Sequence, residues 1–465
     1  MQLTSKPRLM KLPKTLAVLL TIVLCTAELS AQTNTYGPDR LFTTQELKND
    51  FHYLVDSLTK KHPNLYIYTP KVVFQHFTDS LYNGINKPAT ATDFYNTITL
   101  LNAKICNGHT MFLPGGEATA YFSRHSKFLP FYIKIIRGRL YVNMNCSGDT
   151  SVANGSEILS LNGASTKYIL QYLLARQIRD GFNSTYPVWI LDNYFKEYYG
   201  FSFGHPVTFS VAYKNPGCSP KTTQVRALPK DSIKYYQTLR YANRLTNNKV
   251  GQGITVEVNK LQAYAVLTVK TFENERLQLI YRQNFKATID SAFGQIAQTN
   301  AKSLVLDLRD NQGGDFENGQ LLLSYLLGKP FQLLLQGDAT AVVQPLANRF
   351  AGKLFVLVNG GSFSNTGIVC ARLAYYNRAV FIGEETGGNN SIISGFLNDG
   401  QDITLPATHI TCAIPNTSFL IRDDMPNAGH GTMPQFTVTP SIGDMINNND
   451  TVKNFAVRLA LKKDY

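Results

Sequence analysis

Two glycine-containing segments carry residue types that could do chemistry. In the first, an apolar run ending at Leu308 is followed by polar residues and by the pair Gly313-Gly314. Paired glycines let backbone amides approach a ligand without interference from a Cβ atom, so they can supply an oxyanion hole. In the second, an apolar run ending at Val358 leads through a tight turn to Ser362 and Ser364 and into a helical pattern. A hydroxyl at a helix N-terminus lies where free amides and the helix dipole stabilise negative charge.

Serine at a helix start is most often only a cap, so this segment alone does not indicate catalysis. A third segment, which runs from Asn107 through Gly108 and His109 to Thr110, changes that interpretation. A nucleophilic serine needs a base within hydrogen-bond reach, and His109 follows a glycine and precedes an extended apolar run. Six other histidines have no comparable setting: His52, His62, His76, His125, His205 and His409.

The elements that must position these residues fall into three regions. In residues 36–120, Thr43 and Glu46 form a capping box, apolar residues follow at helical spacing, and two further helical patterns precede residue 106, which together predict a helical domain. Residues 125–225 alternate in short strands at 129–136, 140–144 and 158–161. The last strand ends in Asn162-Gly163 and leads into a helix over 168–176. This pattern is typical of a PDZ-like domain, whose groove binds peptide ends.

A polar stretch over 226–260 is predicted to be an irregular linker, and residues 261–465 form the third region. Strand patterns there alternate with helical patterns; the strands are at 263–269, 304–308, 354–358 and 379–382, and the helices at 278–297, 317–327 and 365–376. Such alternation predicts a mixed α/β fold with parallel βαβ units and a ligand site beyond the carboxyl ends of the strands. The glycine pair and the serine segment both follow such strand ends.

Together these segments resemble the tail-specific, or C-terminal processing, serine protease family, to which the catalytic core of tricorn protease is related. The motif around Asp307, Arg309, Gly313 and Gly314 is similar to the family's strand-and-glycine motif, and Ser362-Phe363-Ser364 is similar to its Ser-Ala-Ser motif. The resemblance implies a crotonase-like catalytic domain, Ser364 as nucleophile, and the Asn365 amide as second oxyanion donor. It also implies polypeptide substrates, often cut near their C-termini. Gln435 stands where the family usually has aspartate.

One departure from the family changes the predicted base. Where the processing branch has a lysine, 25 residues after the nucleophile, this chain has Asn389, and an amide cannot accept the proton. The tricorn-like arrangement, a histidine held by a carboxylate, is then the better match, with His109 as base. The resemblance places the acid at Asp423 or Asp424, with the neighbouring glutamates Glu384 and Glu385 as a fallback.

Two other functions remain open from the sequence. An α/β-hydrolase esterase could use Ser364 with Asp399 or Asp423 and with His430, in the order Ser, Asp, His. Because the lysine is absent, the chain could also be a non-catalytic, peptide-binding relative of the family.

The N-terminus and the composition indicate where the protein acts. Four basic residues precede an apolar run from Leu16 to Cys25 and small residues that end at Ala31, which predicts a signal peptide over 1–31 and a periplasmic or secreted protein. No later run is long and uncharged enough to span a membrane. The net charge of +13 is dispersed, which argues against nucleic-acid binding. The cysteines form no CxxC pair, and we expect no metal and no cofactor.

Overall fold

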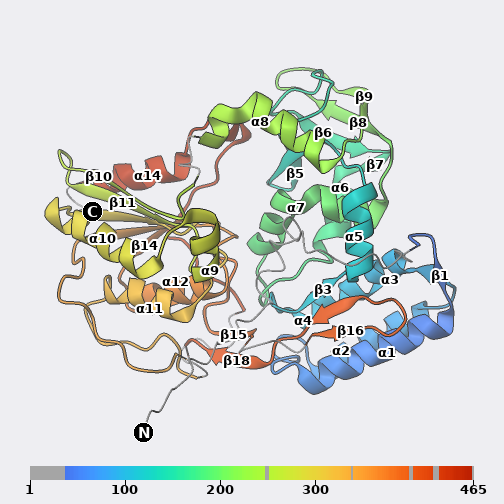
Figure 1. Cartoon of the computed structure of the whole chain (residues 1–465), viewed down its shortest axis with the longest axis horizontal. Helices are drawn as coiled ribbons and strands as arrows, with labels where there is room; N and C mark the ends of the chain where they lie inside the picture. Colours follow the sequence, from blue (N-terminus) through green and yellow to red (C-terminus); the bar gives the residue numbers. More distant parts are fainter. Residues whose placement is uncertain (1–36, 247–250, 337–338, 397–401, 423–428, 463–465) are drawn as a thin grey trace, which may run out of the picture.

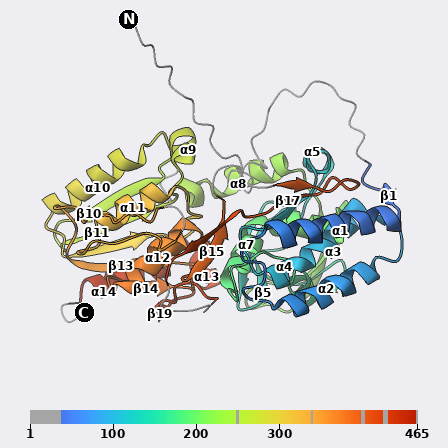
Figure 2. The same cartoon turned by 90° about the horizontal axis from the view of Figure 1, so that it is seen from below.

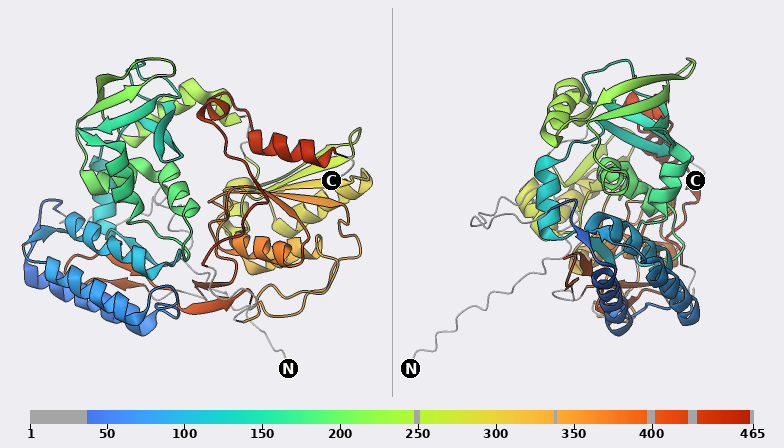
Figure 3. Two further views of the ribbon diagram at one scale, coloured as in Figure 1. Left: turned by 180° about the vertical axis from the view of Figure 1, so that it is seen from behind. Right: turned by 90° about the vertical axis from the view of Figure 1, so that its right-hand side faces the viewer.

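The computed structural model describes residues 37–246, 251–336, 339–396, 402–422 and 429–462. Three parts of the chain succeed one another around the molecule: a helical part, a β-rich part and an α/β part (Figures 1 and 3). The predicted signal segment over 1–31 lies outside the described residues. Within the described ranges, no helix is both long and apolar enough to cross a membrane.

The first part is helical, as predicted. Its elements are β1 (Leu41–Phe42), α1 (Thr44–Lys61), α2 (Lys71–Gly84), β2 (Ala89–Thr90), α3 (Ala91–Ile98), η3 (Thr99–Leu101), α4 (Asn102–Ile105), β3 (Met111–Leu113) and α5 (Gly116–His125). The predicted capping box is confirmed, since the Thr43 hydroxyl accepts from the Glu46 amide at 3.2 Å and Glu46 accepts from the Thr43 amide at 2.7 Å.

The core of this helical part is completed by a hairpin from the far end of the chain. Strand β17 (Thr411–Ala413) pairs with β3 on one side and with β16 (Ile403–Thr404) on the other, and Ile403, Leu405 and Ile410 are buried among the apolar residues of α1 to α4. Figure 2 shows the hairpin alongside α1. By sequence this hairpin falls wholly in the third region, because local patterns do not report pairing between residues about 300 positions apart. The hairpin holds the strand that directly follows His109.

The second part is built on a six-stranded antiparallel sheet, in which five strands follow the order β4-β5-β6-β8-β9 and β7 pairs with β6. Its elements are β4 (Phe131–Ile136), β5 (Arg139–Asn145), β6 (Glu157–Leu161), β7 (Ala164–Ser165), α6 (Thr166–Leu174), α7 (Thr185–Phe203), β8 (Thr208–Lys214) and β9 (Lys221–Arg226). The predicted strands and the helix after the Asn162-Gly163 turn are confirmed. The long helix α7 was not predicted, because its aromatic residues show only a weak one-sided pattern.

The stretch over 226–260 is not the irregular linker that was predicted. This stretch contains the helix α8 (Lys230–Thr246) and the strand β10 (Ile254–Asn259). The helix is mostly polar and exposed, so its sequence carries little of the apolar spacing by which a buried helix is recognised. Strand β10 lies at the edge of the main sheet, where only some of its side chains are buried.

The third part holds a six-stranded sheet in the order β10-β11-β12-β13-β14-β19. Its further strands are β11 (Tyr264–Val269), β12 (Ser303–Asp307), β13 (Lys353–Val358), β14 (Val380–Gly383) and β19 (Phe436–Thr437), all parallel to one another, and only β10 is antiparallel. The four predicted strands are confirmed. Because β12 and β13 are adjacent and parallel, the segments after them meet at one edge of the sheet.

Helices cover both faces of this sheet and bury it. One face packs against helices α10 (Phe285–Gln298), α11 (Phe316–Ser324) and α12 (Asn365–Tyr375), and the other against α14 (Thr451–Ala460) (Figure 3).

The helix predicted over 278–297 begins later than expected. Residues Asn274–Arg276 (α9) and Leu277–Tyr281 (η4) form separate turns that end at Arg282 with a φ of 52°, and α10 starts after the Asn284 cap. The remaining elements are β15 (Ile392–Gly395), β18 (Thr417–Leu420) and α13 (Ile442–Ile446).

Candidate active site

The loop between β13 and α12 is fastened to the end of the neighbouring strand β12. The Ser362 hydroxyl donates to the Leu308 carbonyl at 2.9 Å, and the Phe363 amide donates to the Asn311 carbonyl at 3.1 Å. Ser362 is completely buried and therefore has a structural task. The two segments that the sequence analysis singled out are thus joined directly to each other.

Ser364 is the last residue before α12, and its geometry differs from that of a cap. Its backbone has a φ of 53° and a ψ of −127°, and its side chain makes no capping hydrogen bond. A positive φ is uncommon for a residue other than glycine, and such strained conformations gather at functional sites. The Ser364 hydroxyl instead lies 3.1 Å from Nε2 of His109, a residue 255 positions away in the chain.

His109 is held by its own loop and by aromatic rings. Its amide donates to the Asn107 side chain at 3.0 Å, which also accepts from the Thr110 hydroxyl at 3.0 Å. The His109 ring stacks on Phe363, with centroids 4.8 Å apart, and is 4% exposed. His62, which the sequence analysis set aside, contacts the Thr110 hydroxyl through Nε2 at 3.0 Å and so braces the same loop.

Burial determines the protonation of His109. It lowers the pKa of His109 to about 4, so that the imidazole is neutral at pH 7 and Nε2 can accept a proton. The other ring nitrogen, Nδ1, is buried and has no hydrogen-bond acceptor among the described residues. The two carboxylates predicted to orient the ring, Asp423 and Asp424, lie outside the described residues.

The glycine pair lies directly against the serine. A Cβ atom placed on Gly313 would be 2.8 Å from the Asn365 nitrogen and 2.9 Å from the Ser364 Cβ atom. The Gly313 amide already donates to the Asn311 side chain at 2.9 Å. Within the described part of the chain, the amides of Gly314 and Asn365 donate no hydrogen bond. Of the three predicted oxyanion donors, these two amides are therefore unengaged.

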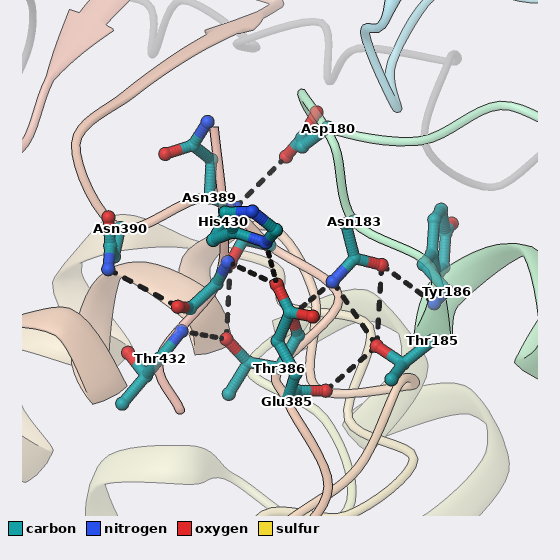
Figure 4. Close-up of polar contacts among 12 residues, drawn as sticks. Asp180, Asn183, Thr185, Tyr186, Glu385, Thr386, Asn389, Asn390, His430 and Thr432 are labelled. Atoms are coloured by element: carbon teal, nitrogen blue, oxygen red, sulfur yellow. Dashed lines mark hydrogen bonds and ion pairs between the residues drawn. The ribbon is translucent and has the colours of Figure 1, made fainter. Parts of the chain in front are cut away.

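Asn389, at the position of the family's lysine, is a buried structural residue. It is 1% exposed, and its side chain hydrogen-bonds the Tyr68 hydroxyl and accepts from the Ser391 amide at 2.9 Å. Its own amide donates to the Asp180 carboxylate at 3.3 Å (Figure 4). These contacts engage the amide side chain in fixing the loop that follows β14.

His430 belongs to a different pair. Its Nδ1 atom lies 3.1 Å from the Glu385 carboxylate, which also accepts from the Gly431 amide at 2.9 Å (Figure 4). Glu385, one of the fallback acids, is therefore engaged with His430. For Glu384, the other fallback, burial raises the pKa, and the residue lines a cavity of about 540 Å³ with Lys134 and Asp192. The histidine in contact with Ser364 is His109.

Helix α7 supports the loop in a way that no sequence motif indicated. Tyr186 stacks on Phe363 with centroids 4.1 Å apart. The Thr185 hydroxyl donates to the Glu385 carbonyl at 2.9 Å, and the Asn183 side chain donates to the Thr386 carbonyl at 2.9 Å (Figure 4). The start of α7 thus braces both the serine loop and the loop after β14. Only the polar residues before the helix could have signalled this, and they are equally typical of a simple cap.

Part of the chain is similar to known peptidases. Residues 263–414 match the model of Peptidase family S41. A curated relative, the chloroplastic carboxyl-terminal-processing peptidase 2 of Arabidopsis thaliana, is 30% identical over 139 residues, which are 27% of this chain. The match spans a quarter of the length of that relative. Together the family match and the relative support a serine-type peptidase.

Solved structures share the fold over almost the whole chain. Mature CPAF complexed with lactacystin matches with a TM-score of 0.64 and 13% identity, covering 90% of this chain and 98% of the other. Mature CPAF in a second crystal structure matches with a TM-score of 0.62 and 13% identity, covering 90% and 97%. The likeness therefore includes the helical, β-rich and α/β parts together.

Proposed function

We propose that this chain hydrolyses peptide bonds through an acyl-enzyme formed on Ser364, with His109 as general base. The observation that carries the proposal is the 3.1 Å contact between Nε2 of His109 and the Ser364 hydroxyl. A base at this distance can take the hydroxyl proton as the oxygen attacks a carbonyl. The match of residues 263–414 to Peptidase family S41 supports the same chemistry.

Backbone amides stabilise the intermediate that this attack forms, and His109 completes the proton transfers. The tetrahedral oxyanion is stabilised by the amides of Gly314 and Asn365, with Gly313 packed behind them. His109 then gives its proton to the leaving amine, and water releases the acyl group by the reverse path. The site draws its residues from the ends of two adjacent strands and from the helical part, so it forms only where these two parts of the chain meet.

The acid of the triad is proposed to be Asp423 or Asp424. When Nε2 of neutral His109 accepts a proton, Nδ1 must carry a hydrogen, and no described residue accepts it. A carboxylate at Nδ1 would stabilise the imidazolium and raise the low pKa that burial alone produces. We expect replacement of the correct aspartate by asparagine to slow catalysis by about 10⁴-fold, and replacement of the other to have little effect.

Polypeptides are the proposed substrates, engaged through their C-termini by the β-rich part over 125–225 acting as a PDZ-like domain. The signal-like sequence over 1–31 supports a further proposal, that the protein is exported to the periplasm or secreted.

A fluorophosphonate probe, which reacts with activated serines, tests the proposal against the two alternatives. We expect the wild-type protein to be labelled, and labelling to be lost in Ser364→Ala and in His109→Ala. An esterase that uses His430 would instead lose labelling in His430→Ala. A folded wild-type protein that is not labelled would refute both enzymes and favour a peptide-binding relative. Cleavage of an unfolded protein such as casein distinguishes a peptidase from other serine hydrolases.

A further inference from the structure

Asp180 is a buried carboxylate that the mechanism above does not use. It precedes α7 by five residues, and it is 2% exposed. One carboxylate oxygen accepts from the Gly108 amide at 2.7 Å, and the other accepts from the Asn389 amide at 3.3 Å. Figure 4 shows Asp180 above the loop that carries Asn389. The carboxylate thus joins the loop before His109 to the loop after β14.

The chemistry of this junction calls for a carboxylate. Two backbone N–H groups point at one side chain, and a carboxylate can accept from both, whereas an asparagine would turn its own NH₂ group toward one of them. No ion pair to Asp180 is formed within the described ranges, so its charge is balanced only by these amides. An uncompensated buried charge costs free energy. Burial accordingly raises the pKa of Asp180 to about 6.

The contact to Gly108 acts directly on the position of His109. A Cβ atom on Gly108 would lie 2.6 Å from the Phe363 ring and 3.0 Å from the Asp180 carboxylate, so this glycine fits closely between the two. The next residue is His109, whose ring stacks on the same Phe363, and the residue after Phe363 is Ser364. A shift of the Gly108 amide would therefore move the His109 ring relative to the serine hydroxyl.

Asp180 itself has a rigid support. The next residue, Gly181, donates its amide to the Cys106 carbonyl at 2.8 Å, at the end of α4. The Asn183 side chain accepts from the amide of Tyr186 in the first turn of α7 at 2.8 Å. The segment is thus fixed to α4 and α7, and it can transmit that rigidity to the His109 loop.

We propose that Asp180 is a positioning residue, whose carboxylate holds the Gly108 and Asn389 amides so that His109 stays within reach of Ser364. This inference rests on the proposed peptidase function, in which His109 is the base. It assigns the carboxylate a role that the sequence did not suggest, because Asp180 lies outside every motif that resembles the protease family.

The test compares Asp180→Asn and Asp180→Ser with the control Asp50→Asn. Asp50 is a matched carboxylate that does not bond the Gly108 or Asn389 amide: it is fully buried and accepts from the amides of Ala407 and Thr408 at 2.9 and 2.8 Å. Each variant is examined by thermal unfolding, by fluorophosphonate labelling, and by kcat and KM on a peptide substrate. The His109 ring is followed by NMR in protein labelled with ¹⁵N-histidine, its signals being assigned by their loss in His109→Ala.

We expect both Asp180 variants to remain folded, with kcat and the labelling rate lowered about 100-fold, as for a catalytic group misplaced by about 1 Å, and with KM nearly unchanged. The His109 ring signals should shift in the Asp180 variants and stay in place in Asp50→Asn. Wild-type kcat and unchanged His109 signals in a folded Asp180 variant would overturn the proposal. Unfolding of both Asp180 variants, with Asp50→Asn intact, would also overturn it, in favour of a purely structural role.

The NMR readout keeps this inference separate from the proposed function. If wild-type protein is neither labelled nor active, the peptidase proposal fails, yet the His109 signals still report whether Asp180 holds the ring. Shifted signals in an inactive protein would support positioning without catalysis.

Discussion

Replacing Gly313 by alanine is expected to abolish serine reactivity while the fold survives. The new methyl group would lie 2.8 Å from the Asn365 nitrogen, 2.9 Å from the Ser364 Cβ atom and 3.0 Å from the Phe363 carbonyl oxygen. Ordinary van der Waals contacts of a Cβ atom begin at 3.4 Å, so the nearest of these atoms must move by 0.6 Å. None of the three can move by a change of rotamer, since two are backbone atoms and one is a Cβ atom.

This displacement acts on the nucleophile and on an oxyanion donor together. Misplacing a catalytic group by about 1 Å can cost about 100-fold in rate, and losing one oxyanion donor costs about 100- to 1,000-fold. We therefore expect Gly313→Ala to lower the rate of fluorophosphonate labelling at least about 100-fold. Gly313 also has a φ of 92°, which adds a backbone cost of about 1 to 2 kcal/mol for an L-residue.

Gly163→Ala separates the two effects. Gly163 has a φ of 83°, close to that of Gly313, but no atom lies within 4 Å of its added Cβ. It should show the backbone cost alone, measured as a lower midpoint of thermal unfolding, and should keep the wild-type labelling rate. The reasoning is refuted if Gly313→Ala is labelled at the wild-type rate, or if Gly163→Ala loses as much labelling.

Three further predictions concern Asn389, His430 and Asp180. Asn389→Lys should not supply a base, because residue 389 is 1% exposed and its side chain hydrogen-bonds the Tyr68 hydroxyl and the Ser391 amide. We expect a lower midpoint of thermal unfolding and no gain in fluorophosphonate labelling. His430→Ala should keep labelling within about threefold of wild type, since His430 contacts Glu385 and the base in contact with Ser364 is His109; lost labelling would favour the esterase. Burial raises the pKa of Asp180 from 3.8 to about 6, so between these values the folded protein binds a proton that the unfolded chain releases. The unfolding free energy of wild type relative to Asp180→Asn should fall by about 2 kcal/mol as the pH rises from 4 to 6, and a difference that does not vary with pH would contradict this.

The sequence predicted the elements whose signals are local. The capping box of Thr43 and Glu46, the four buried strands of the main sheet and the turn at Asn162-Gly163 each depend on residues within one short segment, and all are confirmed. The carboxyl ends of parallel strands share one edge, so the meeting of the Gly313 and Ser364 segments also followed from the pattern. The structure brings His109 to Ser364, while the chemical roles of both residues stay predictions.

What the sequence could not predict depends on contacts between distant segments. The hairpin of β16 and β17 completes the core of the helical part, although nearly 300 residues separate it from β3. Asp180 and helix α7 brace the site from a part of the chain that carries no catalytic motif. In each case the residue types are ordinary, and only the partner across the fold gives them their task.

These contacts explain why a histidine base is consistent with the loss of the lysine. A lysine at position 389 would have to be deprotonated in a buried place beside Asp180, whose negative charge favours the ammonium form. With asparagine there, the Asp180 carboxylate accepts two backbone amides and has no cation to neutralise. The buried loop before β3 presents a ring that burial keeps neutral, and a neutral imidazole is the form that can accept the Ser364 proton. We therefore expect Asp180→Asn to weaken the proposed His109 base, because it loosens the Gly108 amide that precedes His109.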